Sequence, residues 1–135
     1  MPGNPIENVT IVKAAGTAGQ VSIFPPGSSD DVWVLRSMKF MPNASLSADN
    51  TNYASLRAYK GTGTGTPVCA ARPTTVAGGA LTAGTKVDLA LTATGADLEI
   101  SQANPLTLQV THGGTGGAVD GNFAAEFEWL KRGAV

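Results

Sequence analysis

Apolar and polar side chains alternate with a period of two in the last third of the chain. Between Asn122 and Lys131 the odd positions are apolar and the even positions mostly polar, with Phe123, Phe127 and Trp129 on one face. Successive side chains of a β-strand point to opposite faces of a sheet, so this pattern predicts a strand with one buried face. We expect Trp129 in the core because it shares this parity.

Other segments alternate in the same way or are short β-branched and apolar runs. In Tyr53–Lys60, for example, Ala54, Leu56 and Ala58 share one face. About eight short antiparallel strands are expected, at 9–13, 21–24, 32–41, 53–60, 68–72, 86–92, 106–111 and 122–131. Residues 98–101 are compatible with a strand or a turn.

The segment from Val32 to Met41 is apolar on both faces. Simple alternation gives one face Val32, Val34, Met38 and Phe40, and the other Trp33, Leu35 and Met41. A strand in a two-layer sandwich meets water on one side. The second face therefore needs a cover, which loops or an N-terminal arm provide, or else a neighbouring chain. The pattern leaves both explanations open.

Composition agrees with short strands joined by many turns. Of the 135 residues only 14% are charged, and the chain holds 17 glycines and 8 prolines. Gly, Pro and Thr recur in every candidate helix window. We therefore predict an all-β fold with a single β-sandwich or jelly-roll-like domain over residues 1–135, in which residues 1–15 form an N-terminal arm and the first strand.

Charge and cysteine content exclude several classes of function. The net charge is −1, from 9 basic and 10 acidic residues spread along the chain, so no basic cluster is available to bind nucleic acid. The single cysteine excludes an internal disulfide framework. No apolar run is long enough for a membrane span, and the N-terminus has no secretory signal pattern. We expect a soluble protein made in a cytoplasm.

Two glycine-rich segments resemble phosphate-binding loops but lack essential residues. In the segment 61–66 Thr66 replaces the third glycine of the dinucleotide motif, and Pro67 follows where a helix is required. In the segment 79–86 Thr85 separates the second glycine from Lys86. We interpret the first as a loop and the second as a turn.

Two further residues and one segment are candidates for chemistry, and each has a simpler structural interpretation. His112 is the one histidine and precedes two glycines, which favours a surface histidine over a catalytic one. Cys69 lies in an apolar stretch and is predicted to be a buried, unreactive thiol. The segment 49–52 lacks the spacing of a calcium loop and is predicted to be a turn. We expect no enzyme activity, cofactor or metal.

A carbohydrate-binding module is the alternative class of function. Tyr53 and Tyr59 lie on the polar side of their predicted strand and flank Arg57. Two exposed rings could form a platform for a sugar, but a tyrosine that lies over a neighbouring strand or subunit fits equally well. A glycan partner therefore remains open.

Four segments resemble the small head decoration, or capsid cement, proteins of tailed bacteriophages. The first, residues 33–56, reads WVLRSMKFMPNASLSADNTNYASL. The second and third are LTAGTKVDL at 81–89 and PLTLQVT at 105–111, and the closing strand is 123–129. The likeness covers about residues 30 to 130 and contains no catalytic signature. It departs from the family pattern at Pro105 and in the loop 61–67.

This resemblance implies a β-sandwich that forms a homotrimer on the outer surface of a phage head and bridges subunits of the major capsid protein. The virion exterior is then the expected location. The strand with two apolar faces and the low charge are consistent with a chain packed among others. The candidate contacts with another subunit or with the capsid are Trp33, Val34, Arg36, Met38, Tyr53, Arg57 and Tyr59.

Overall fold

The computed structural model describes residues 4–63 and 65–131, and in these residues the fold is all-β. The strands are β1 (Ile6–Lys13), β2 (Gly19–Ile23), β3 (Val32–Pro42), β4 (Tyr53–Lys60), β5 (Thr66–Pro67), β6 (Arg72–Pro73), β7 (Val87–Asp88), β8 (Glu99–Ile100), β9 (Leu106–Gly113) and β10 (Val119–Lys131). A short 3₁₀ helix, η1, spans Gly95–Leu98. No helix in this part of the chain is long and apolar enough to cross a membrane.

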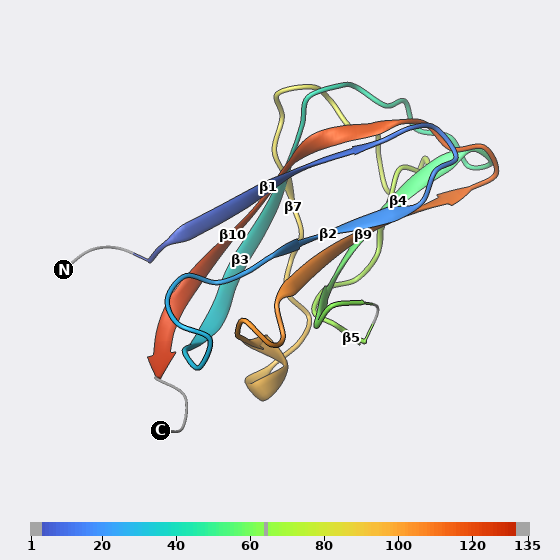
Figure 1. Cartoon of the computed structure of the whole chain (residues 1–135). Helices are drawn as coiled ribbons and strands as arrows, with labels where there is room; N and C mark the ends of the chain where they lie inside the picture. The colour runs from blue at the N-terminus through green and yellow to red at the C-terminus, as the bar shows by residue number, and fades with distance from the viewer. Residues whose placement is uncertain (1–3, 64, 132–135) are drawn as a thin grey trace.

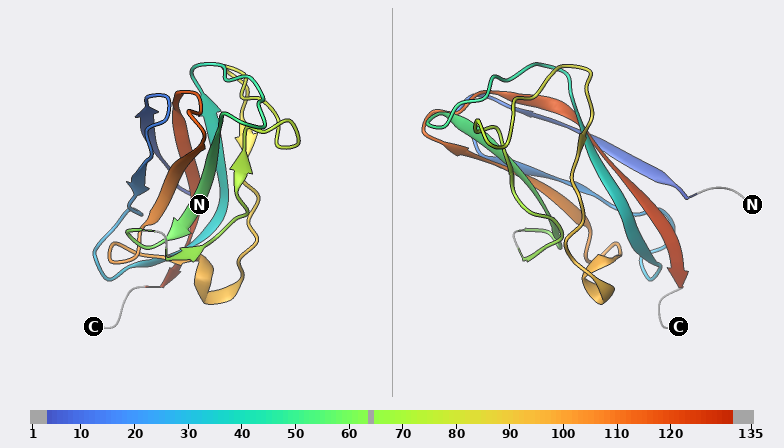
Figure 2. Two further views of the ribbon diagram at one scale, coloured as in Figure 1. Left: turned by 90° about the vertical axis from the view of Figure 1, so that its right-hand side faces the viewer. Right: turned by 180° about the vertical axis from the view of Figure 1, so that it is seen from behind.

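The strands form two antiparallel sheets that face each other (Figures 1 and 2). Sheet A has the order β1-β10-β3-β7, with β8 also paired to β3. Sheet B has the order β2-β9-β4-β5, with β6 also paired to β4. The connection from β1 to β2 passes from the edge of one sheet to the edge of the other. The prediction of a β-sandwich is therefore confirmed.

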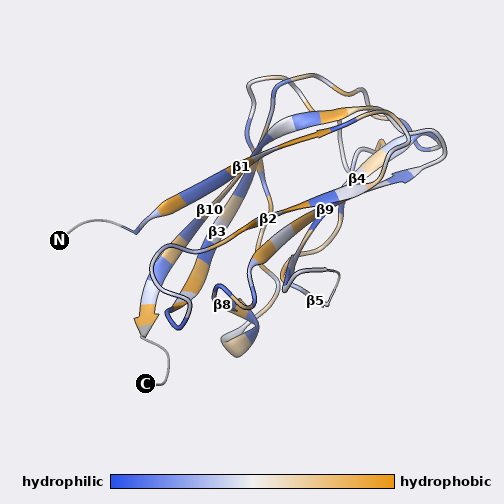
Figure 3. Ribbon diagram, in the orientation of Figure 1, coloured by the Kyte–Doolittle hydropathy of each residue, from blue (hydrophilic) through white to orange (hydrophobic). Residues whose placement is uncertain are grey.

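The core lies between the sheets and consists mainly of side chains at the apolar positions of the predicted alternation. The long strands show bands of alternating hydropathy (Figure 3), and the inward apolar positions of β4, β9 and β10 that lie between the sheets are buried. Their fully or almost fully buried apolar residues are Ala54, Leu56, Ala58, Leu106, Leu108, Val110, Val119, Phe123, Ala125 and Phe127. Thr107 is the polar exception. Its hydroxyl lies 2.8 Å from that of Ser22 and donates a 2.6 Å hydrogen bond to the Gly61 carbonyl.

The prediction that β3 has two apolar faces is wrong, because a β-bulge changes the parity of the strand. Ser37 pairs with Glu126 and Leu35 with Phe127, so Arg36 is an extra residue on β3. Such an extra residue turns the following side chains to the other face. Leu35 thereby joins Met38 and Phe40 in the core, and all three are at most 1% exposed. Trp33 and Leu35, assigned to one face, thus share the inner face with Met38 and Phe40, while Val34 and Met41 lie on the outer face.

Two expected strands are much shorter than the sequence pattern predicted. Residues 68–71 do not form a regular strand; the short strand β5 ends just before them, and β6 begins at Arg72. Each ends in proline, which has no N–H to continue the ladder. The backbone N–H of Val68 still donates to Ala58, so the segment follows β4. In the predicted strand 86–92 only β7 is regular, although Leu89 is buried.

The bulge can be tested by comparing two adjacent residues. Leu35→Ala removes a fully buried side chain and should lower the free energy of unfolding by about 2–5 kcal/mol. Val34→Ala, at a half-buried position on the opposite face, should cost less than about 1 kcal/mol. Chemical denaturation measures both values. Without the bulge Leu35 would lie on the solvent side together with Ser37, and Val34 would point into the core. Val34→Ala would then lower the free energy of unfolding more than Leu35→Ala.

Candidate interaction site

The structure brings together no cluster of metal-ligating side chains in its described residues. No group of three or more His, Cys, Asp and Glu side chains in residues 4–63 and 65–131 is placed to hold a metal ion. The ring of His112 is half-buried, and its Nε2 lies 3.0 Å from the Gly117 carbonyl oxygen. This histidine is more enclosed than a surface residue because its ring packs against the turn that follows β9.

The prediction of a buried thiol at Cys69 is confirmed. The side chain is 1% exposed, and its Sγ accepts a 3.4 Å hydrogen bond from the backbone N–H of Ala58. Burial raises the pKa of the thiol, since the charged thiolate loses its hydration. The hydrogen bond and the positive charge of Arg57 act in the opposite direction but are weaker.

Asp49 forms the predicted turn. Its Oδ1 accepts backbone hydrogen bonds from Asn52 at 2.8 Å and from Thr51 at 2.7 Å. These bonds, with that from Asn52 the larger influence, lower the pKa of the Asp49 carboxyl because they stabilise its charged form. The geometry is that of an Asx turn, in which the carboxylate accepts hydrogen bonds from backbone N–H groups that follow it in the chain.

The second glycine-rich segment adopts the predicted turn, whereas the first includes position 64, which lies outside the described residues. No helix follows either segment, so neither has the helix N-terminus that binds a phosphate. β5 begins at Thr66, the last residue of the first segment. In the second, Gly84 has φ of +80° and donates its N–H to the Pro42 carbonyl at 2.9 Å. Both segments therefore serve as connections.

The tryptophans meet at one end of the β3–β10 pair, which we call the aromatic end (Trp33, Trp129 and Leu130). Trp33 pairs directly with Trp129, and their rings pack edge to face with centroids 5.0 Å apart. The Trp33 Nε1–H donates a 2.9 Å hydrogen bond to the Pro26 carbonyl in the β2–β3 loop. Gln102 donates to the adjacent Pro25 carbonyl at 2.6 Å, so the same loop is fixed from two sides.

The expectation that Trp129 lies in the core is wrong. Its parity is inward, but 46% of its surface is exposed, and Leu130 is 43% exposed. In Figure 1 the end of β10 and the start of β3 extend past the strands of sheet B, which agrees with the exposure of Trp129. The β2–β3 loop passes nearby and carries Phe24, which is 51% exposed. Parity gives the direction of a side chain but not how far the opposite sheet extends.

The structure does not place the candidate contact residues on one surface. The four on β3 and the three on β4 belong to different sheets. Met38 is 1% exposed and belongs to the core, so it is removed from the candidate contacts. Arg36 points outward and forms an ion pair with Glu128, with 2.7 Å between its Nε and the carboxylate oxygen. Val34 is half-buried next to it.

The tyrosines of β4 contact their own sheet. Tyr53 pairs with Gly113 of β9, where a Cβ atom would overlap the tyrosine ring. The ring therefore lies over the glycine of the neighbouring strand and protects its backbone. The guanidinium carbon of Arg57 lies 5.8 Å from the centre of the Tyr59 ring, and its Nε donates to the Cys69 carbonyl at 2.9 Å. These contacts account for both tyrosines without a sugar.

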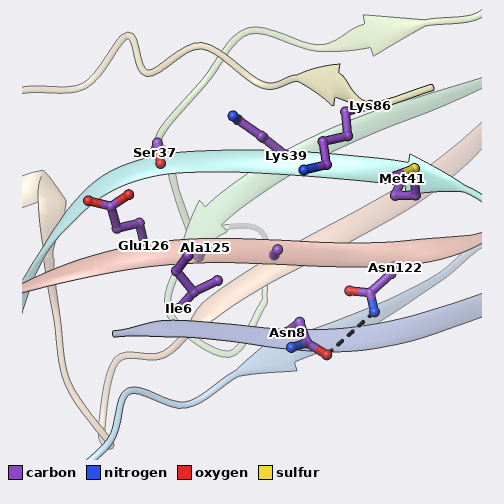
Figure 4. Close-up of a pocket in the computed structure, with 10 residues that line it drawn as sticks. Ile6, Asn8, Ser37, Lys39, Met41, Lys86, Asn122, Ala125 and Glu126 are labelled. Atoms are coloured by element: carbon purple, nitrogen blue, oxygen red, sulfur yellow. Dashed lines mark hydrogen bonds between the residues drawn. The ribbon is translucent and has the colours of Figure 1, made fainter. Parts of the chain in front are cut away.

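Sequence reasoning missed a hollow on the outer face of sheet A. It has a volume of about 380 Å³ and lies across β1, β10 and β3 (Figure 4). The small side chain of Ala124 on the central strand forms part of its lining, with Asn8 on one side and Lys39 on the other. The signal in the sequence was an alanine between longer outward residues. That signal becomes visible only once the register of three strands is known.

Comparisons with known proteins give only weak structural likenesses. No protein-family model and no curated protein matches the chain. A structure of the Gx strain of infectious bursal disease virus matches with a TM-score of 0.34 and 14% identity, over 94% of this chain and 33% of that chain. A subviral particle of the VP2 protein of this virus gives 0.33 and 12%, over 97% and 39%. Virus-derived T=1 particles give 0.32 and 14%, over 97% and 38%.

This chain therefore spans about a third of the length of the viral chains that it matches. TM-scores this low define neither a shared family nor a shared function. The class of protein that the geometry does define is a small β-sandwich with a partly exposed aromatic end.

The role of Asp49 predicts a dependence of stability on pH. Because its pKa is lowered in the folded chain, its contribution is complete above the ordinary aspartate pKa and is lost as the pH falls through the lower, folded value. Asp49→Ala should therefore reduce stability at neutral pH and have little effect in strong acid. Denaturation of both proteins across this range measures the difference. A constant difference down to strong acid would contradict this role.

Proposed function

We propose that this protein is a structural component of a virion, a decoration protein that binds the outer surface of a phage head as a homotrimer and stabilises it. The proposal rests on the aromatic end as the contact surface. The kind of partner is inferred from the resemblance to capsid cement proteins, which covers residues 33–56, 81–89, 105–111 and 123–129. The major capsid protein is the expected partner.

The aromatic end has the properties of a protein contact. Tryptophan is enriched among the residues that contribute most to binding, because one ring buries a large area with little loss of side-chain entropy. Both tryptophans of the chain are here. Trp33 is fixed by its ring contact and its hydrogen bond to Pro26, so the surface is ordered before a partner arrives. This arrangement favours association with a rigid partner.

Stabilisation of a shell requires no chemistry by the decoration protein. A protein that binds the assembled shell, and not its separated subunits, lowers the free energy of the shell by mass action. The low proportion of charged residues, 14%, suits a surface that is largely covered by neighbours. A compact sandwich with an apolar end meets these requirements.

The test compares two exposed apolar residues. Trp129→Ser removes the exposed ring of the aromatic end, whereas Val76→Ser changes an apolar residue that is 65% exposed in a loop elsewhere. We expect the unaltered chain and Val76→Ser to form trimers and to bind expanded phage heads. Trp129→Ser should weaken both by at least about tenfold. Light scattering and co-sedimentation with heads measure the two properties.

Thermal unfolding of both variants serves as the control for folding, since Trp129 also packs on Trp33. An unaltered chain that is monomeric and does not bind heads would contradict the proposal. Specific binding to a sugar on a glycan array, lost in Tyr53→Ala or Tyr59→Ala, would support the carbohydrate-binding alternative instead.

A further inference from the structure

β1 forms the longest free edge in the described part of the two sheets. It has eight residues and pairs with β10 on one side only. The other outer strands have five residues in β2 and two each in β5, β6, β7 and β8. An exposed edge of this length presents a row of backbone N–H and C=O groups to which another strand can bind.

The hydrogen bonds of β1 show which backbone groups face outward. Phe127 donates its N–H to the Pro5 carbonyl at 3.0 Å, and residues along an antiparallel pair alternate between bonded and non-bonded positions. The odd residues of β1 therefore bond to β10. The N–H and C=O groups of Asn8, Thr10 and Val12 point away from it, toward the free edge.

The sequence of β1 is complementary to itself in antiparallel orientation around Thr10. If Thr10 of one chain lies opposite Thr10 of a second, Asn8 lies opposite Val12 of the other copy, and all three positions exchange bonds through their outward backbone groups. In the positions between them, Val9 lies opposite Ile11. Glu7 then lies opposite Lys13, which gives two pairs of opposite charge in a twofold symmetric contact.

The exposed apolar residues of β1 fit the same arrangement. Ile6 is 63% exposed and Val12 is 66% exposed, both on the outer face of sheet A. With Val12 opposite Asn8 of the second copy, Ile6 of that copy is its diagonal neighbour, within reach of a branched side chain. The twofold axis repeats this contact. Both apolar side chains thus gain a neighbour that they lack in one chain.

The charges of β1 select one register. Inward-pointing charges on an edge strand normally oppose its pairing with other strands. A shift by two residues, which keeps the backbone bonds, would place Glu7 opposite Ile11 and leave its charge uncompensated. Only pairing around Thr10 brings Glu7 opposite Lys13. In the single chain the end of the Lys13 side chain, Nζ included, lies over Gly19, where a Cβ atom would overlap it, so this flexible side chain turns toward the second copy when the pair forms.

We propose that β1 is a second interaction surface, at which two copies of this chain join their A sheets edge to edge around Thr10. The partner is a second copy because the strand matches its own sequence in charge, in apolar side chains and in backbone bonding. The contact is separate from the aromatic end and does not depend on the proposed function. It predicts pairwise association, whereas the aromatic end is proposed to form trimers.

Two substitutions at Thr10 test the backbone contact. Thr10→Pro removes an N–H that faces the free edge and leaves the β1–β10 bonds intact, while Thr10→Val retains the N–H. Both are made in the Trp129→Ser chain, which lacks the ring proposed for the trimer. We expect sedimentation equilibrium to show monomers and dimers for Trp129→Ser and for Thr10→Val, and monomers alone for Thr10→Pro.

Charge reversal tests the register. Glu7→Lys should weaken the dimer by about tenfold, because it places like charges opposite each other twice. Adding Lys13→Glu should restore the original affinity. Hydrogen exchange gives an independent readout, since the amides of Asn8, Thr10 and Val12 should become protected only in the dimer.

Three results would overturn the proposal: a Trp129→Ser chain that stays monomeric at high concentration, equal dimerisation of Thr10→Pro and Thr10→Val, or a double charge reversal that fails to restore affinity. Circular dichroism of each variant shows whether it is folded. If trimers are absent but this dimer forms, the proposed function fails and the β1 contact stands.

Discussion

The pairing of β3 with β10, and the bulge at Arg36 within it, is the constraint on which the rest of the structure depends. These are the two longest strands, and they form the centre of sheet A. The extra residue turns Leu35 inward beside Met38 and leaves Arg36 outside to pair with Glu128. Without this change of parity, Leu35 would lie on the face opposite to Met38 and Phe40, and apolar side chains of β3 would face water.

The same pair of strands also produces the surface proposed to bind other chains. Where β3 and β10 extend past sheet B, Trp33 is partly buried against the core, and Trp129 packs on it with 46% of its surface exposed. Loop hydrogen bonds to Pro25 and Pro26 hold this end in place. The most exposed apolar side chains of this strand pair therefore lie at its end and not along the middle of β3, where the sequence pattern called for a cover by loops, an N-terminal arm or a neighbouring chain.

The sequence predicted the fold class, the buried face of β4 and the character of Cys69, because each depends on local alternation or composition. It failed where the outcome depends on a second strand. The bulge is defined by the register between β3 and β10, and the exposure of Trp129 by the extent of sheet B. The hollow around Ala124 requires three strands in register, and the free edge of β1 requires the strand order. Period-two patterns contain none of this information.

Intrinsic tryptophan fluorescence tests the central claim most directly, because the chain has two tryptophans and both are at the aromatic end. If this end is the contact surface, the emission maximum should shift to shorter wavelength as the chain assembles on phage heads or as trimers form at rising concentration. The shift should follow the increase in mass measured by light scattering. An emission spectrum that stays unchanged while the mass rises would show that the chain associates through another surface, and it would contradict the account.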